Sequence, residues 1–270
     1  MLIHFFKLQG TGNDFVAIDN RDNQLSLEKL AEIAPKLCDR RFGVGADGLL
    51  AITHSNNTIS DYTMIYLNAD GSDAGMCGNG GRCIAKLANH LGYPAKHKFN
   101  VHGFPYEVVV DNSEVTLSFP AQPEINTISD PEFGQIDVIF TGTEHICIHI
   151  QDPSLLDNQE WIRNKGRDLR YDSRFAPKGT NVNFYSSIDE NVVKMITYER
   201  GVEDLTLSCG TGSLAASICH KRNQSGEFIH VICSGGSLYT KFEFDKSTNI
   251  YKNLLLKGAA EIVFIGEIHV

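Results

Sequence analysis

Two short segments of the chain each place a cysteine among small residues, between a predicted strand and a predicted helix. They read Met76-Cys77-Gly78-Asn79-Gly80-Gly81-Arg82 and Ser208-Cys209-Gly210-Thr211-Gly212-Ser213. Glycines let the backbone approach a ligand closely, and the free N–H groups of a helix N-terminus favour an anion. The same partial positive charge makes a thiol at that position more reactive. One such loop could be a tight turn with a packed cysteine, whereas two matching loops indicate a pair of functional thiols.

Two thiols on opposite sides of one carbon could remove a proton from one face and return a proton to the other. That chemistry inverts a stereocentre. The carbanion formed on the way needs electrostatic stabilisation, which two helix N-termini at the adjacent carboxylate would supply. We therefore expect Cys77 and Cys209 to act as an acid–base pair that holds one proton between two sulfurs. The scheme requires no cofactor, and no pyridoxal-lysine signature is visible.

The other cysteines fit a structural role. Neither Cys-x-x-Cys nor another usual zinc spacing occurs, so we expect no metal site. Cys38, Cys147, Cys219 and Cys233 are interpreted as small buried hydrophobic residues, and Cys83 as structural.

The chain contains a sparse internal repeat at an offset of 132 residues. The offset aligns Gly10-Thr11 with Gly142-Thr143, Asn13 with His145, Tyr66 with Tyr198, Asn68 with Arg200, and Cys77-Gly78 with Cys209-Gly210. The matches keep their order, and the offset is close to half of the chain length. We therefore predict two homologous, pseudo-symmetric α+β domains.

The elements that must position these residues are mostly strands. Many short apolar or alternating runs indicate strands, and only a few stretches have helical periodicity. The predicted helices are a segment from the N-cap Ser26 to about Cys38, the stripe Ile84–Leu91, the segment 157–166, and the stripe 214–218. This balance predicts the α+β class. The predicted domains are 1–117 and 118–263, with a C-terminal strand at about 264–270 packing back on the first.

Composition limits the partners. The chain has 270 residues, of which 42% are hydrophobic and 21% charged, as in globular proteins. Its 24 basic and 33 acidic residues give a net charge of −9, which disfavours nucleic acid. No apolar run is long enough for a membrane span and no secretory signal is visible, so we expect a cytoplasmic protein without a membrane partner.

At these residues the sequence resembles the diaminopimelate epimerases, cofactor-independent amino-acid epimerases of lysine and peptidoglycan precursor synthesis. The resemblance covers essentially the whole chain. Its most specific blocks are Gly12-Asn13-Asp14-Phe15, Asn68-Ala69-Asp70-Gly71-Ser72, Cys77-Gly78-Asn79-Gly80, Gly179-Thr180-Asn181-Val182-Asn183-Phe184, Tyr198-Glu199-Arg200-Gly201 and Cys209-Gly210-Thr211-Gly212. The resemblance implies two similar domains with the active site in the cleft between them, a small amino-acid substrate, and a homodimer.

The resemblance also implies roles for individual residues. Cys77 and Cys209 match the two catalytic bases. The family residues that hold the carboxylate at the reacting centre correspond here to Gly78, Asn79, Gly210 and Thr211. Glu199 and Arg200 match contacts to the substrate amine and to the far carboxylate. The family's side-chain amides that contact the substrate correspond to Asn13, Asn68 and Asn181. A family histidine near the catalytic pair corresponds to His145. Each of the asparagines could instead be a turn residue, and His145 a core histidine.

One stretch departs from the family pattern. Where the family has Gly-Asn-Pro-His, this chain has Gly142-Thr143-Glu144-His145, and Gly48 stands where a second contact is often Gln. Thr143 has a shorter reach than Asn and no amide N–H. If Glu144 faces the site, its charge would repel a distal carboxylate and favour a cation; otherwise it points to solvent.

The sequence therefore predicts conversion of LL- to meso-diaminopimelate, with alternatives left open. The first is a racemase of a basic amino acid such as histidine, lysine or arginine, with the same two thiols. Proline and hydroxyproline racemases also resemble the chain. From other classes, we keep a cysteine hydrolase that uses one thiol with His145, and a binding protein without catalysis.

Overall fold

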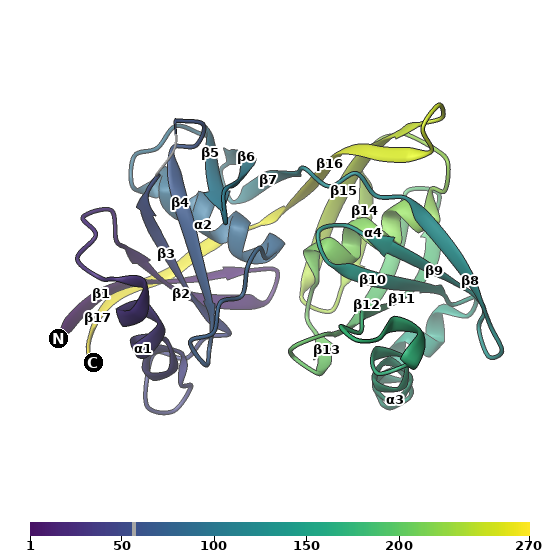
Figure 1. Cartoon of the computed structure of the whole chain (residues 1–270), viewed down its shortest axis with the longest axis horizontal. Helices are drawn as coiled ribbons and strands as arrows, with labels where there is room; N and C mark the ends of the chain where they lie inside the picture. The colour runs from purple at the N-terminus through teal and green to yellow at the C-terminus, as the bar shows by residue number, and fades with distance from the viewer. Residues whose placement is uncertain (56–57) are drawn as a thin grey trace. The chain divides into compact units, whose positions relative to one another are not determined.

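The computed structural model describes residues 1–55 and 58–270, and the chain divides into two compact units (Figure 1). The first comprises Met1–Ser118 with Gly258–Val270, and the second Phe119–Lys257. The sequence predicts a boundary after residue 117 and a returning strand at about 264–270; in the structure the return is longer. The reason is that strand β17 pairs with strand β1 along all but its last residue, from Glu261 opposite Gln9 to His269 opposite Leu2.

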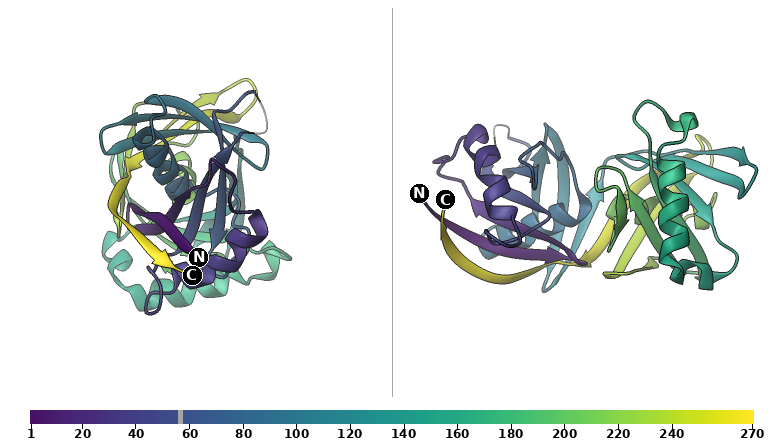
Figure 2. Two further views of the ribbon diagram at one scale, coloured as in Figure 1. Left: turned by 90° about the vertical axis from the view of Figure 1, so that its left-hand side faces the viewer. Right: turned by 90° about the horizontal axis from the view of Figure 1, so that it is seen from below.

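In the first unit, neighbouring strands alternate between antiparallel and parallel pairing. β1 is antiparallel to β2, β2 parallel to β3, β3 antiparallel to β4, β4 parallel to β5, and β5 antiparallel to β6. The strands are β1 (Leu2–Gly10), β2 (Asn13–Asp19), β3 (Gly48–His54), β4 (Tyr62–Asn68), β5 (Lys96–Val101), β6 (Phe104–Asp111), β7 (Glu114–Phe119) and β17 (Glu261–His269). The two chain ends lie side by side because β17 is antiparallel to β1 (Figure 2).

The second unit repeats this order of pairings. β9 is antiparallel to β10, β10 parallel to β11, β11 antiparallel to β12, β12 parallel to β14, and β14 antiparallel to β15. The strands are β8 (Ile125–Asp130), β9 (Gly134–Phe140), β10 (Glu144–His149), β11 (Asn181–Asp189), β12 (Val192–Glu199), β13 (Asp204–Thr206), β14 (Ile229–Cys233), β15 (Gly236–Asp245) and β16 (Ile250–Ala259). Mixed sheets with few helices confirm the predicted α+β class, and the shared topology gives the weak sequence repeat a structural counterpart.

The helices occupy equivalent places in the two units. α1 (Leu27–Cys38) follows the second strand of its ladder and α2 (Gly78–His90) the fourth. In the second unit α3 (Gln159–Arg170) follows the second strand, β10, and α4 (Gly210–His220) follows the fourth, β12, after the short strand β13. Short 3₁₀ turns at Pro153–Asp157 and Ser173–Phe175 flank α3. α3 begins later than predicted because the Asn158 side chain, after the first of these turns, caps it by accepting from Trp161 N.

Each unit has an apolar core under its helices. In the first, Leu30, Ile33 and Leu37 of α1 pack with buried residues of β2 and β3. In the second, Ile162 and Leu169 of α3 pack with residues of β10, β11 and β12. In the described part of the chain, no helix has the length and apolar character needed to cross a membrane.

Candidate active site

Cys77 lies at the N-cap of α2, shortly after the end of β4. Its backbone is extended, with φ −119° and ψ 128°, and its side chain is half-buried. The helix starts at Gly78, and Gly81 N closes the first turn on Cys77 O at 2.7 Å. The sequence therefore places a thiol where the first free N–H groups of a helix converge, as predicted.

The orientation of Asn13, the first residue of β2, follows from its neighbours. Its Nδ2 donates to Asp47 Oδ2 at 2.6 Å, and because a carboxylate only accepts, Oδ1 must face the other way. That Oδ1 accepts from Cys77 Sγ at 3.8 Å and from Asn79 Nδ2 at 3.4 Å. Three predicted site residues are thus brought together at Asn13, which offers an acceptor to the thiol.

Arg82, one turn into α2, fixes this arrangement from behind. Its guanidinium is fully buried and donates to Asn79 Oδ1 at 2.9 Å, Thr11 Oγ1 at 3.0 Å and Gly78 O at 3.2 Å. Because Asn79 Oδ1 is held by a pure donor, Asn79 Nδ2 is directed at Asn13. Sequence reasoning missed both Arg82 and Asp47. Arg82 stands inside the cysteine motif, but nothing in its local pattern distinguishes a buried arginine from an exposed one.

Asn68 ends β4 and bonds to its own loop. Its Nδ2 donates to Ser72 Oγ at 3.0 Å, and its backbone N to Ser72 O at 2.8 Å. Gly48, opposite Asn68 in the β3–β4 register, has no room for a longer side chain. A Cβ there would lie 2.6 Å from Tyr66 Cε2 and 2.6 Å from Leu67 O. Glycine, where the family often has Gln, therefore fits the Tyr66 ring that packs against position 48.

Cys209 is the N-cap of α4 in the second unit and is buried. Its sulfur accepts from Gly212 N at 3.4 Å and lies 3.7 Å from Thr211 Oγ1. Gly212 cannot be larger, since a Cβ would meet Asn183 Oδ1 at 2.4 Å and Cys209 Sγ at 3.2 Å. This sulfur therefore accepts a backbone hydrogen bond and also has a hydroxyl group next to it.

His145, at the start of β10, is fully buried behind Thr211. Asn183 Nδ2 donates to Ile146 O at 2.9 Å, which orients the amide, and it also faces His145 Nδ1 at 3.1 Å. Nδ1 therefore accepts and the ring proton is on Nε2, which lies 3.0 Å from Thr211 Oγ1. Burial lowers the pKa of His145 to about 3, with the positive charge of Arg200 adding to the effect. His145 is thus a neutral donor that supports the Thr211 hydroxyl.

Thr143 and Asn181 join the same network. Thr143 Oγ1 lies 2.9 Å from His145 Nε2 and 3.4 Å from Thr211 Oγ1. Asn181 is buried between strands: its Nδ2 donates to Glu144 O and its Oδ1 accepts from Arg200 N, both at 2.9 Å. Asn181 therefore ties the start of β10 to the end of β12.

Glu144 does not point away from the site residues. Its Oε2 lies 2.8 Å from Arg200 Nη1, and its Oε1 lies 3.2 Å from Lys178 Nζ. Arg200 Nη1 also donates to Gly179 O at 3.2 Å. Burial opposes ionisation of Glu144, but hydrogen bonds from its own backbone N–H, Arg200 and Lys178 outweigh it and lower its pKa. Arg200 follows directly on Glu199, the last residue of β12.

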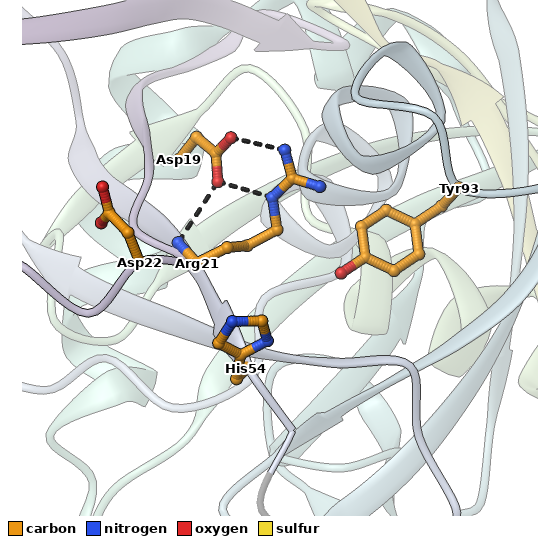
Figure 3. A pocket seen from close by; sticks show the side chains of 5 residues that line it. All are labelled: Asp19, Arg21, Asp22, His54 and Tyr93. Atoms are coloured by element: carbon orange, nitrogen blue, oxygen red, sulfur yellow. Dashed lines mark hydrogen bonds and ion pairs between the residues drawn. The ribbon is translucent and has the colours of Figure 1, made fainter.

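A hollow of about 420 Å³ elsewhere in the first unit involves none of the predicted site residues (Figure 3). It is lined by Asp19, Arg21, Asp22, His54 and Tyr93. Arg21 makes a bidentate ion pair with Asp19, at 2.7 Å for each bond, and lies over the Tyr93 ring.

Residues 1–55 and 58–270 contain no group of three or more His, Cys, Asp or Glu side chains placed to hold a metal ion.

Comparison with known proteins identifies the family of the chain. The family model described as diaminopimelate epimerase matches residues 5–114 and 138–262. The diaminopimelate epimerase of Flavobacterium psychrophilum is 37% identical over 264 residues, covering 96% of this chain and 97% of its relative. That of Aquifex aeolicus is 36% identical, covering 98% of both chains.

Solved structures with low sequence identity share the fold. A Bacillus anthracis phenazine biosynthesis protein of the PhzF family has a TM-score of 0.75 at 14% identity, covering 100% of both chains. A probable proline racemase from Agrobacterium radiobacter has a TM-score of 0.72 at 12% identity, covering 99% of this chain and 93% of its own.

Proposed function

Because the chain belongs to the diaminopimelate epimerase family, a family of isomerases, we propose that it converts LL-diaminopimelate to meso-diaminopimelate by inverting one Cα. Cys77 and Cys209 are the acid–base pair that acts on the two faces of that carbon. The observation that carries the proposal is that each unit places a thiol at the N-cap of its equivalent helix. The mechanism uses no cofactor.

The surroundings of the two sulfurs support a division of protonation states. Cys77 donates to Asn13 Oδ1, an acceptor, which favours its neutral thiol. Cys209 accepts from Gly212 N and faces the Thr211 hydroxyl, which favours its thiolate. We therefore propose that Cys209 is the base and Cys77 the acid in the substrate-free enzyme, and that the roles exchange after each inversion.

The reacting carboxylate is held at the helix N-termini in this proposal. The first turns of α2 and α4 present backbone N–H groups that have no partner within their own helix. Gly78 and Asn79 supply them from one helix, and Gly210 and Thr211 from the other. Their fixed dipoles stabilise the negative charge that develops on the carboxylate when the Cα proton leaves.

The charges around Glu144 favour diaminopimelate over a basic amino acid. Glu144 is paired with two cations, Arg200 and Lys178, so this cluster carries a net positive charge. A distal carboxylate supplies the negative charge that such a cluster lacks, whereas the side chain of lysine or arginine supplies none. In this assignment Arg200 binds the distal carboxylate, Glu199 the substrate amine, and Asn13 and Asn68 line the site.

The cysteine hydrolase alternative has less support. A hydrolase of this kind needs a histidine that takes the proton of its nucleophile. In this chain the two ring nitrogens of His145 bond to Asn183 and to threonine hydroxyls, and Thr211 Oγ1 lies between the ring and Cys209. The cytoplasmic location and the homodimer remain predictions.

The test is epimerisation of LL-diaminopimelate by wild type, Cys77→Ala, Cys209→Ala and Cys38→Ala. Either catalytic change removes one of the two proton carriers, so we expect activity to fall by at least about 10³-fold. Cys38→Ala is the matched control, since burial raises the pKa of that thiol to about 12. Wild-type epimerisation by either single catalytic variant would refute the two-thiol assignment.

A further inference from the structure

The Glu144–Arg200 ion pair lies where this chain departs from its family, in the same unit as Cys209, between the start of β10 and the residue after β12. Diaminopimelate ends, at its far side, in a second amino-acid head with one ammonium and one carboxylate. We infer that Glu144 binds that distal ammonium while Arg200 binds the adjacent carboxylate, so that the ion pair selects a zwitterionic end. This inference rests on the proposed function and names a specificity residue that the family pattern, with Pro at this position, does not supply.

Only one of the three guanidinium nitrogens of Arg200 contacts another group in the described part of the chain. Within the described part of the chain, both of its side-chain partners, Gly179 O and Glu144 Oε2, contact Nη1. Nη2 and Nε therefore form an available edge with the geometry that a carboxylate accepts in two parallel bonds. The guanidinium keeps its contact with Glu144 while that edge binds a ligand.

Glu144 can exchange one of its partners. The carboxylate is about one-third exposed, and its Oε1 is held by Lys178 Nζ, whose side chain is 75% exposed. A pair this exposed contributes little free energy, because water competes for both charges. A substrate ammonium can therefore take the place of Lys178 at Oε1 while Arg200 remains at Oε2.

The backbone positions of Glu144 and Arg200 are also fixed, which allows the pair to select between ligands with different distal groups. Asn181 bonds to the backbone of both partners, to Glu144 O and to Arg200 N, each at 2.9 Å. An α-amino acid head carries its ammonium and its carboxylate on one carbon, and the Glu144 and Arg200 side chains that would bind them are themselves in contact, Oε2 to Nη1, at 2.8 Å. Adjacent opposite charges on the protein thus match adjacent opposite charges on the ligand.

The opposite reading makes Glu144 a competitor that a distal carboxylate must displace from Arg200. The two readings predict opposite signs for Glu144→Gln. If Glu144 accepts from the distal ammonium, its loss weakens the binding of diaminopimelate. If Glu144 competes for Arg200, its loss strengthens that binding. Three amino acids separate the contributions: diaminopimelate has both distal charges, 2-aminopimelate only the carboxylate, and lysine only the ammonium.

The experiment measures kcat/KM and calorimetric affinity for these three compounds in wild type, Glu144→Gln, Glu144→Asp and Glu190→Gln. Glu190→Gln is the matched control: Glu190 pairs with Lys221 at 3.2 Å, in the turn at the opposite end of the β11–β12 hairpin from Arg200. Melting temperatures check that each variant is folded.

We expect wild type to prefer diaminopimelate over 2-aminopimelate by about tenfold or more, the usual effect of one charged hydrogen bond. Glu144→Gln should remove most of that preference through KM and affinity, with kcat little changed, and Glu144→Asp should retain part of it. Tighter binding of diaminopimelate by Glu144→Gln, or an unchanged ratio, would overturn the inference. If wild type binds diaminopimelate without epimerising it, the proposed function fails, and the affinities still test Glu144.

Discussion

At the scale of single residues, the two thiols differ in what faces their sulfur. The Cys209 sulfur accepts from Gly212 N and lies beside Thr211 Oγ1, while the Cys77 sulfur donates to Asn13 Oδ1. We expect iodoacetamide to alkylate Cys209 with a lower pH midpoint than Cys77, because only the thiolate reacts. The measurement is mass-spectrometric alkylation of each cysteine against pH.

Thr211→Val supplies the control for that prediction, because it removes the hydroxyl and keeps the shape. It should raise the midpoint of Cys209 and leave that of Cys77 in place. Equal midpoints for the two thiols in wild type would contradict the proposed division into base and acid.

His145 gives a prediction about stability and pH. Burial lowers the pKa of His145 in the folded protein to about 3, whereas its ordinary pKa is 6.5. Between these two pH values the unfolded chain binds a proton at this residue and the folded protein does not. Stability from this site is complete above pH 6.5 and falls as pH decreases toward 3, by about 1.4 kcal/mol per pH unit. Relative to His145→Gln, wild type should lose about 2 kcal/mol between pH 6.5 and 5.

Urea unfolding of both proteins across that range measures the difference, in which the contributions of the carboxylates cancel. A difference that stays constant with pH would show that folding does not lower the pKa of His145, and the neutral-donor role would lose its support.

At the scale of the elements, the two helix starts are equivalent but differ in their tolerance of a side chain. A Cβ at Gly80 would find its nearest atoms at 3.4 Å, in Leu50 and Met64. A Cβ at Gly212 would lie 2.4 Å from Asn183 Oδ1 and 3.2 Å from Cys209 Sγ. We expect Gly212→Ala to lower kcat by about tenfold or more through displacement of Cys209, and Gly80→Ala to stay within about threefold.

Steady-state kinetics of the two alanine variants, with melting temperatures as the folding check, test this pair of positions. Equal losses in both variants, or a larger loss in Gly80→Ala, would show that the crowding at Gly212 does not control the position of the thiol.

The sequence predicted the elements whose signals are local. Ser26 caps α1 by accepting from Lys29 N, and the glycine-rich segments start α2 and α4 as expected. The strands β5, β8, β13 and β16 were not predicted. β5 (Lys96–Val101) and β16 (Ile250–Ala259) mix lysine and asparagine with apolar residues, and pairing with neighbouring strands, β4 and β6 for β5 and β7 and β15 for β16, decides their structure.

At the scale of the whole molecule, the ordered matches at an offset of 132 residues predicted the repeat, and the two units show the same succession of strand pairings. The candidate site was predictable as far as motifs reach: the two thiols, the helix starts and the amides. The contact of Arg82 with Thr11, that of Asp47 with Asn13 and that of Glu144 with Arg200 were not, because each joins residues that only the folded chain brings together.

The central claim is that one thiol from each unit acts on one carbon, and a single isotope measurement tests it. Epimerisation of LL-diaminopimelate is started in deuterium oxide, and early samples are separated into remaining substrate and new product. Two thiols predict deuterium at the inverted Cα of nearly all product molecules, while the remaining substrate keeps its protium, because the proton is taken by one sulfur and replaced from another. Product that retains the original protium at that carbon would mean that one group both removes and returns the proton, and would contradict the account.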